Sequence, residues 1–207
     1  MPAVDIFPIE LTEREAHRLA DLYGVLADLR MVLKICDLIL QKIGPKDNLV
    51  EVEALQAAAL VRYCRTTGGV RTSFSISMDW IERLPSELQQ LHNEFHALRD
   101  KHIAHSVNDW ELNVPVAQYR LNRETNKGEV IMVSVQGHRI VSMHEEAIVH
   151  LQRLAGALAD MLEGEFQVER DKVLEIAKRI PQDEIERRMG TPPRVPGRGA
   201  LTEPRPR

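Results

Sequence analysis

Leucines at helical spacing constrain the fold of this 207-residue chain more than any other feature. Between residues 13 and 43, apolar side chains recur at steps of three, four and seven residues, which places them on one face of an α-helix. The members of this series are Leu19, Leu22, Leu26, Leu29, Leu33 and Leu40. We therefore expect one long helix over residues 13–43, begun by a capping box of Thr12 and Glu15 and ended by Gly44 and Pro45.

Similar series predict three further helices. The second is expected from Asp47 or Asn48 to the glycines at 68 and 69, and the third over residues 86–105. The fourth begins at a capping box of Ser142 and Glu145 and carries apolar residues as far as 164. Residues 70–84 are rich in Ser and Thr, which predicts a loop with a short turn near residues 79–83. The four main helices predict an all-α helical bundle.

A β-hairpin is expected between the third and fourth helices. Apolar residues alternate with polar ones after Asn108, and residues 130–135 are rich in β-branched side chains. The stretch Asn126-Lys127-Gly128 has the composition of a turn. We expect the hairpin over residues 115–135 and a short third strand at 138–141.

The chain divides by composition into three parts. Residues 1–164 would form the helical domain with its inserted hairpin at about 115–141, and residues 165–189 a charged helical extension. From Gly190 to Arg207, Pro, Gly and Arg dominate, a composition that cannot bury a core. We expect this tail to be disordered.

The overall composition excludes several classes of protein. A net charge of −4 argues against a surface that holds nucleic acid everywhere, so any RNA contact must be local. Two distant cysteines, Cys36 and Cys64, indicate neither a disulfide framework nor a zinc ribbon and favour a cytoplasmic protein. No segment has the pattern of a signal peptide or a membrane span. No phosphate-binding loop or dinucleotide fingerprint is present, and no cofactor or metal is expected.

The segment Arg99-Asp100-Lys101-His102-Ile103-Ala104-His105 carries the clearest chemical signal. Arginine stays charged and binds phosphate oxygens with a planar guanidinium, and histidine exchanges a proton near neutral pH. An arginine, a polar residue and a histidine in one short segment therefore suit chemistry on a phosphodiester.

Together with the helix order, these residues resemble the HEPN superfamily, and in particular its abortive-infection branch. The resemblance rests on Val61-Arg62-Tyr63-Cys64-Arg65 in the second helix and on residues 98–106 at the end of the third, and it covers residues 12–164. It implies a homodimeric, metal-independent ribonuclease with RNA as its substrate and Arg99, Asp100 and His105 as its catalytic residues. For a toxin or phage-defence effector of this kind, it also implies an antitoxin or another regulatory protein.

The motif has alternative interpretations. On a straight helix Arg99 and His105 lie roughly 120° apart around the axis, so either the helix unwinds or a second copy completes the site. Alternatively, Arg99 pairs with Glu94 or Glu111, and His105 only ends a helix, where the dipole favours a cation. The chain would then be a catalytically silent HEPN-like binding or assembly module.

Other residues could bind substrate. Arg62 and Arg65 lie near the end of the second helix, where they could contact phosphates or remain solvated. His96 and His92 have a spacing that suits zinc, but no third ligand is evident, and we take them as surface histidines, with His96 able to line a substrate groove. His102 shares the apolar face of its helix and is expected in the core, with substrate binding as the alternative.

Overall fold

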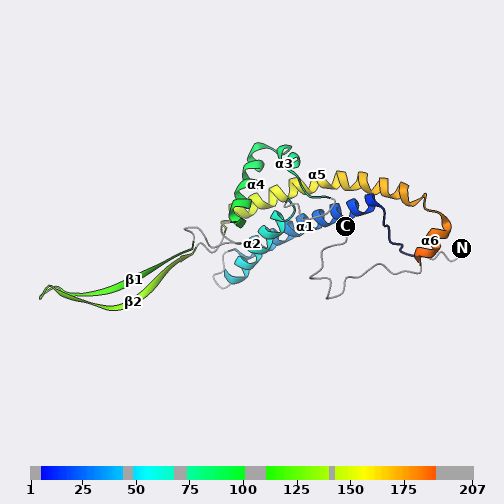
Figure 1. Ribbon diagram of the computed structural model, residues 1–207. Helices are drawn as coiled ribbons and strands as arrows, with labels where there is room; N and C mark the ends of the chain where they lie inside the picture. The colour runs from blue at the N-terminus through cyan, green and yellow to red at the C-terminus, as the bar shows by residue number, and fades with distance from the viewer. Residues whose placement is uncertain (1–5, 44–48, 68–73, 101–110, 140–142, 190–207) are drawn as a thin grey trace.

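The computed structural model describes residues 6–43, 49–67, 74–100, 111–139 and 143–189. Within these residues the chain is mainly helical and carries one two-stranded hairpin, as the sequence predicts (Figure 1). None of the described helices is long and apolar enough to cross a lipid bilayer. The elements in chain order are α1 (Arg14–Lys42), α2 (Leu49–Cys64), α3 (Met78–Glu82), α4 (Ser86–Leu98), β1 (Glu111–Asn122), β2 (Lys127–Arg139), α5 (Glu145–Ala177) and α6 (Gln182–Met189).

The two longest helices, α1 and α5, run antiparallel along the helical body (Figure 1). Near the start of α1, the Tyr23 ring lies 6.2 Å from the ring of Phe166. Toward its end, Asp37 accepts a hydrogen bond from Gln152 at 2.6 Å. The order of these contacts along the two helices fixes their opposite directions.

Helices α2 and α4 complete the bundle. α2 packs against α1, α4 packs against α5 and α2, and α3 packs against α4. The expected apolar face of α1 is confirmed, because Leu22, Leu26 and Leu29 are fully buried. The largest fully buried side chains are Leu22, Leu26, Leu29, Ile39, Leu60, Tyr63, Ile76, Ile81, Ile148, Leu151, Leu154 and Leu158.

The helix starts differ from the predicted capping boxes. α1 is preceded by Glu13 rather than Thr12, and no side chain caps its first turn, so the Thr12 prediction is wrong. A tertiary contact explains the difference, because the Glu13 carboxylate binds Arg188 of α6 at 3.2 Å. α5 is preceded by His144, and Ser142 lies outside the described residues.

The domain boundary expected after residue 164 falls inside α5, which continues without a break to Ala177. The extension is tied to the main body, since Glu165 pairs with Arg18 of α1 at 2.8 Å. The tail from residue 190 onward lies outside the described residues.

The hairpin is longer than expected. β1 and β2 pair antiparallel, and the register shifts next to Gln118 and Tyr119, where β2 has one extra residue. Asn126 adopts the positive φ of 52° that the turn requires. Gly128 was expected in the turn but lies in β2, opposite Leu121. The first residues of the predicted third strand belong to β2, and residues 140–142 are outside the described part.

Candidate functional site

The described part of the HEPN-like motif lies at the end of α4. The α-helix stops at Leu98, and Arg99 and Asp100 form a wider π-helical turn. The Arg99 guanidinium donates a hydrogen bond to the Asp100 carboxylate, and their side chains are 40% and 57% exposed. π-helical turns are rare in proteins, and those that do occur often lie at functional sites. This turn therefore holds a cation at the surface through its chain neighbour.

The ion-pair partner of Arg99 is neither of the two glutamates that the sequence analysis considered. Among the described residues, Asp100 pairs with it, whereas Glu94 accepts a hydrogen bond from Gln90 at 2.7 Å. The side chain of Glu111 lies outside the described part. An exposed pair between chain neighbours is held weakly, so phosphate could displace Asp100 from the guanidinium.

His105 and His102 both fall within residues 101–110, outside the described residues. The distance between Arg99 and His105, and the core position expected for His102, therefore stay predictions.

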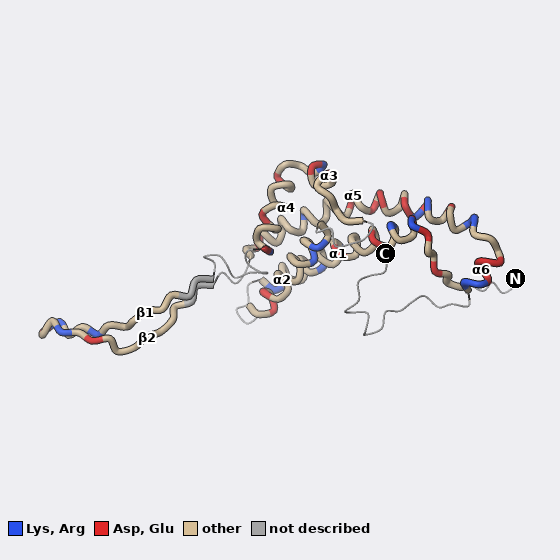
Figure 2. Tube along the Cα trace, viewed as in Figure 1, with Lys and Arg blue, Asp and Glu red and all other residues tan. Residues whose placement is uncertain are grey.

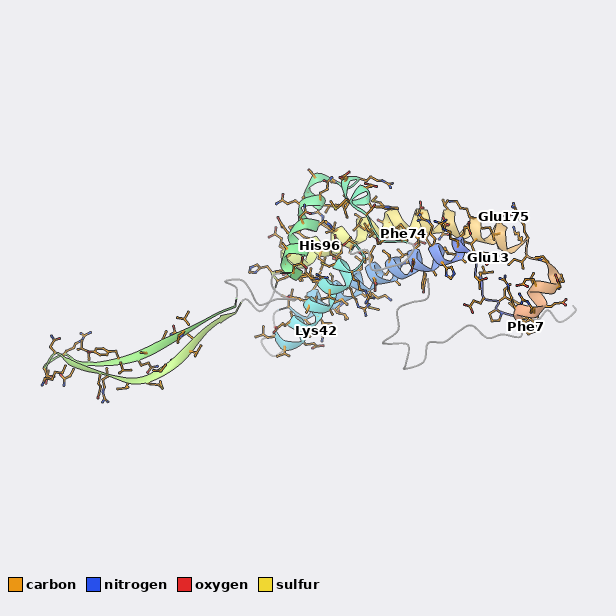
Figure 3. All side chains as sticks on the ribbon, in the orientation of Figure 1. Phe7, Glu13, Lys42, Phe74, His96 and Glu175 are labelled. Carbon is orange, nitrogen blue, oxygen red and sulfur yellow. The ribbon has the colours of Figure 1, made fainter. Side chains whose placement is uncertain are left out.

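A cluster of four polar side chains, Tyr63, Thr67, His92 and His96, lies where α2 meets α4. The Tyr63 hydroxyl and Nδ1 of His92 are 2.7 Å apart, and the Thr67 hydroxyl and Nε2 of His96 are 2.8 Å apart. The two imidazole centroids are separated by 4.5 Å. Figure 3 shows His96 on α4, where the helix faces α2. This histidine cluster joins the two helices immediately before the Arg99 turn.

Both imidazoles of the histidine cluster are biased toward the neutral form. Burial lowers the pKa of His92 to about 4, and the neighbouring His96 acts in the same direction. Burial also lowers the pKa of His96, which Asp100 opposes and Arg99 reinforces. His92 is only 5% exposed, so the expectation of a surface histidine is wrong for it. Neither ring carries a stable positive charge at pH 7.

The histidine cluster does not make a metal site in the described structure. Among the residues described, no group of three or more His, Cys, Asp or Glu side chains lies close enough to hold an ion. One ring nitrogen of each histidine is hydrogen-bonded, Nδ1 of His92 to Tyr63 and Nε2 of His96 to Thr67.

The two cysteines are free and buried. The Cys64 thiol donates to the carbonyl oxygen of Phe95 at 3.7 Å, and burial raises its pKa to about 12. Burial likewise raises the pKa of Cys36 to about 12. Because the thiolate is the nucleophilic form, neither cysteine is suited to nucleophilic catalysis at neutral pH.

Arg62, in the last turn of α2, and Arg65, the residue that follows α2, both face α1. Arg62 donates to the carboxylate of Asp28 at 3.1 Å, and Nε of Arg65 donates to the same carboxylate at 2.8 Å. The Asp28 side chain is only 5% exposed. These arginines are therefore neither simply solvated nor unpaired cations, and a phosphate would have to compete with a buried carboxylate for them.

Two features of this region escaped the sequence interpretation. Asp28 lies within the apolar series of α1, one residue before Leu29, and an acid on a buried face is a signal that it has a partner elsewhere. His92 follows Leu91 and shares the face of Leu88 and Phe95, which is a similar signal for a buried imidazole. Neither signal names the partner, because Tyr63 is 29 residues from His92 in the chain.

No protein-family model, no curated protein and no solved structure matches this chain.

Proposed function

We propose that this chain is a metal-independent endoribonuclease of the HEPN type, with Arg99, Asp100 and His105 as its catalytic residues. In the cell it would act as a toxin or phage-defence effector that a partner protein holds silent. The proposal rests on the resemblance of residues 98–106 to the HEPN signature.

One structural observation carries the proposal: the Arg99 guanidinium is exposed in a π-helical turn and is held by Asp100. A phosphate-binding arginine must be reachable by solvent and must be oriented before substrate arrives. We expect Asp100 to orient the guanidinium in the free protein and to be displaced by phosphate when substrate binds, because the pair is exposed and leaves the cation accessible.

The chemistry assigned to these residues is an internal phosphoryl transfer. His105 would take the proton of the ribose 2′-hydroxyl, whose oxygen attacks phosphorus, and the bond from phosphorus to the 5′-oxygen breaks. Arg99 would stabilise the negative charge that develops on the phosphorane. A protonated histidine supplies the proton for the leaving 5′-oxygen. The products are a 2′,3′-cyclic phosphate and a 5′-hydroxyl.

Two copies of the motif would build one site. On a regular helix, Arg99 and His105 point in directions that differ by roughly 120°, so one copy does not easily converge on one phosphodiester. In a homodimer, the two copies can bring both of their motifs to one phosphodiester, so that one copy's His105 would act as the base and the partner's His105 as the acid.

A second candidate function is a catalytically silent binding or assembly module. The observation that favours it is the use of His92 and His96 in contacts between α4 and α2. If His105 is used in packing as well, its imidazole would be buried and would not titrate. An NMR titration of His105 separates the two functions, because a catalytic imidazole must be accessible and titrate near neutral pH.

The test of nuclease activity uses the full chain with structured RNA in EDTA, beside Arg99→Ala and His105→Ala variants. We expect cleavage by the wild type, fragments that end in a 2′,3′-cyclic phosphate, and a loss of at least ~100-fold in rate for each variant.

Matched controls are Arg187→Ala and His17→Ala. Arg187 is also an exposed arginine paired with a nearby carboxylate, that of Glu184, but it lies on α6. His17 is an exposed histidine on α1. Both controls should cleave at the wild-type rate. Activity that persists in Arg99→Ala and His105→Ala, or that disappears equally in the controls, would exclude this site.

A further inference from the structure

Over residues 115–121 and 128–135, the hairpin of β1 and β2 has one apolar face. In an antiparallel pair, directly opposite residues point to the same face. Pro115 is opposite Val135, and Ala117 is opposite Val133. The extra residue in β2 brings Val130 onto this face, opposite Tyr119. The hairpin apolar face therefore consists of Pro115, Ala117, Tyr119, Leu121, Val130, Val133 and Val135.

The contact between Tyr119 and Gly128 confirms how the face is ordered. A Cβ atom on Gly128 would collide with the Tyr119 ring, so this ring lies over the glycine on the same face of the hairpin. The opposite face is mixed, and it carries Gln118, Ser134 and an ion pair of Arg120 with Glu129. The hairpin is thus amphipathic, although it belongs to no larger described sheet.

The apolar face lies open to solvent. The exposed fraction of its large side chains ranges from 48% at Leu121 to 70% at Val133. The two strands make their extensive contacts with each other, and the hairpin projects away from the helical body (Figure 1). An isolated two-stranded hairpin is marginally stable in water, so this face needs a partner.

The charge pattern restricts that partner. No charged residue occurs in 114–119 or 130–136, and the charges of the described hairpin side chains gather toward its tip (Figure 2). A phosphate or a carboxylate placed on the apolar face would lose water without gaining a counter-charge. The tip carries three basic residues, Arg120, Arg123 and Lys127, and two acidic residues, Glu124 and Glu129. Its net charge is therefore too small for a basic cluster that binds anionic lipids.

We propose that the hairpin apolar face is covered by the same face of a second copy, so that two hairpins stack as a two-layer sandwich about a two-fold axis. A two-fold interface brings identical patches together, and an uncharged patch meets no like charge in this arrangement. Burial of both faces would remove roughly 1,000 Å² from water, the lower limit for a specific interface. The inference does not depend on nuclease activity.

Oligomeric state tests the interface. By light scattering on a sizing column, the full chain at micromolar concentration should have twice its chain mass of 23.6 kDa. Val135→Lys should raise the dissociation constant at least ~100-fold, because two lysines would enter the interface of each dimer. Val133→Lys, near the centre of the face, should have the same effect. Circular dichroism checks that the helices of each variant remain folded.

The matched control is Gln136→Lys, which places the same charge on the adjacent residue of β2 but on the opposite face. It should leave the dimer intact. A monomeric wild type, a Val135→Lys dimer of unchanged affinity, or equal dissociation by Gln136→Lys would each overturn the interface. So would a monomer that sediments with phosphatidylcholine vesicles. The interface is judged by the difference in mass between Val135→Lys and Gln136→Lys, whereas the nuclease proposal is judged by RNA cleavage in Arg99→Ala and His105→Ala, which leave the hairpin unchanged, so the failures of the two proposals remain distinguishable.

Discussion

At the scale of single residues, burial of His92 makes the Tyr63 hydroxyl its essential partner. Tyr63→Phe removes that hydroxyl and leaves Nδ1 of a nearly inaccessible imidazole without it. We expect the free energy of unfolding to fall by about 1–3 kcal/mol, measured by urea denaturation. Tyr23→Phe is the control, because Tyr23 is exposed and should change stability by less than ~0.5 kcal/mol. Equal effects of the two substitutions would contradict the role of this bond.

The low pKa of His92 predicts a pH dependence of stability. The folded pKa of about 4 lies below the ordinary value of 6.5, so between these values the unfolded chain binds more protons. The stabilisation is complete above pH 6.5 and is lost as the pH falls toward 4. The contribution is at most about 3 kcal/mol.

Urea denaturation at several pH values between 4.5 and 7 measures this dependence. Carboxylates also titrate at the acid end, so the informative quantity is the difference in slope between the wild type and His92→Gln. We expect a flatter slope in His92→Gln and the wild-type slope in His17→Gln, where the histidine is exposed. A wild-type slope in His92→Gln would show that this imidazole is not the titrating group.

At the scale of elements, Asp28 joins α1 to the end of α2 through Arg62 and Arg65. Asp28→Asn keeps the shape but removes the charge that both guanidinium groups bind. We expect the free energy of unfolding to fall by about 2 kcal/mol, measured by chemical denaturation. Asp37→Asn is the matched control on α1, because Asp37 is exposed and the asparagine keeps an oxygen that can accept the hydrogen bond from Gln152. A similar loss in both variants would mean that the charge of Asp28 does not hold the two helices together.

Periodicity predicted the elements better than the contacts between them. The burial of Leu22, Leu26 and Leu29 follows from their spacing, because a helix turns by a fixed angle per residue. The start of α1 did not follow from Thr12, because the carboxylate of Glu13 is held by Arg188 from the other end of the chain. Local patterns carry no information about a partner 175 residues away.

At the scale of the whole molecule, the continuous helix α5 makes residues 165–177 part of the main body. Phe166 packs on Tyr23, and Val173 is buried. Removal of residues 165–207 should therefore lower the free energy of unfolding by about 3 kcal/mol or more, measured by urea denaturation. The control removes residues 190–207 only and keeps every described contact, so it should retain the wild-type value. Equal stability of the two truncated chains would show that the body ends at residue 164.

The sequence by itself determined the four main helices, the hairpin and the adjacency of Arg99 and Asp100, because helical period, strand alternation and chain neighbours are local properties. Only the tertiary structure decided that the Asp28 carboxylate binds Arg62 and Arg65, that burial beside Tyr63 keeps His92 neutral, and that the hairpin apolar face is left open. These outcomes depend on which surfaces meet in space. Burial and charge pairing act between residues that are distant in the chain, and no local pattern specifies them.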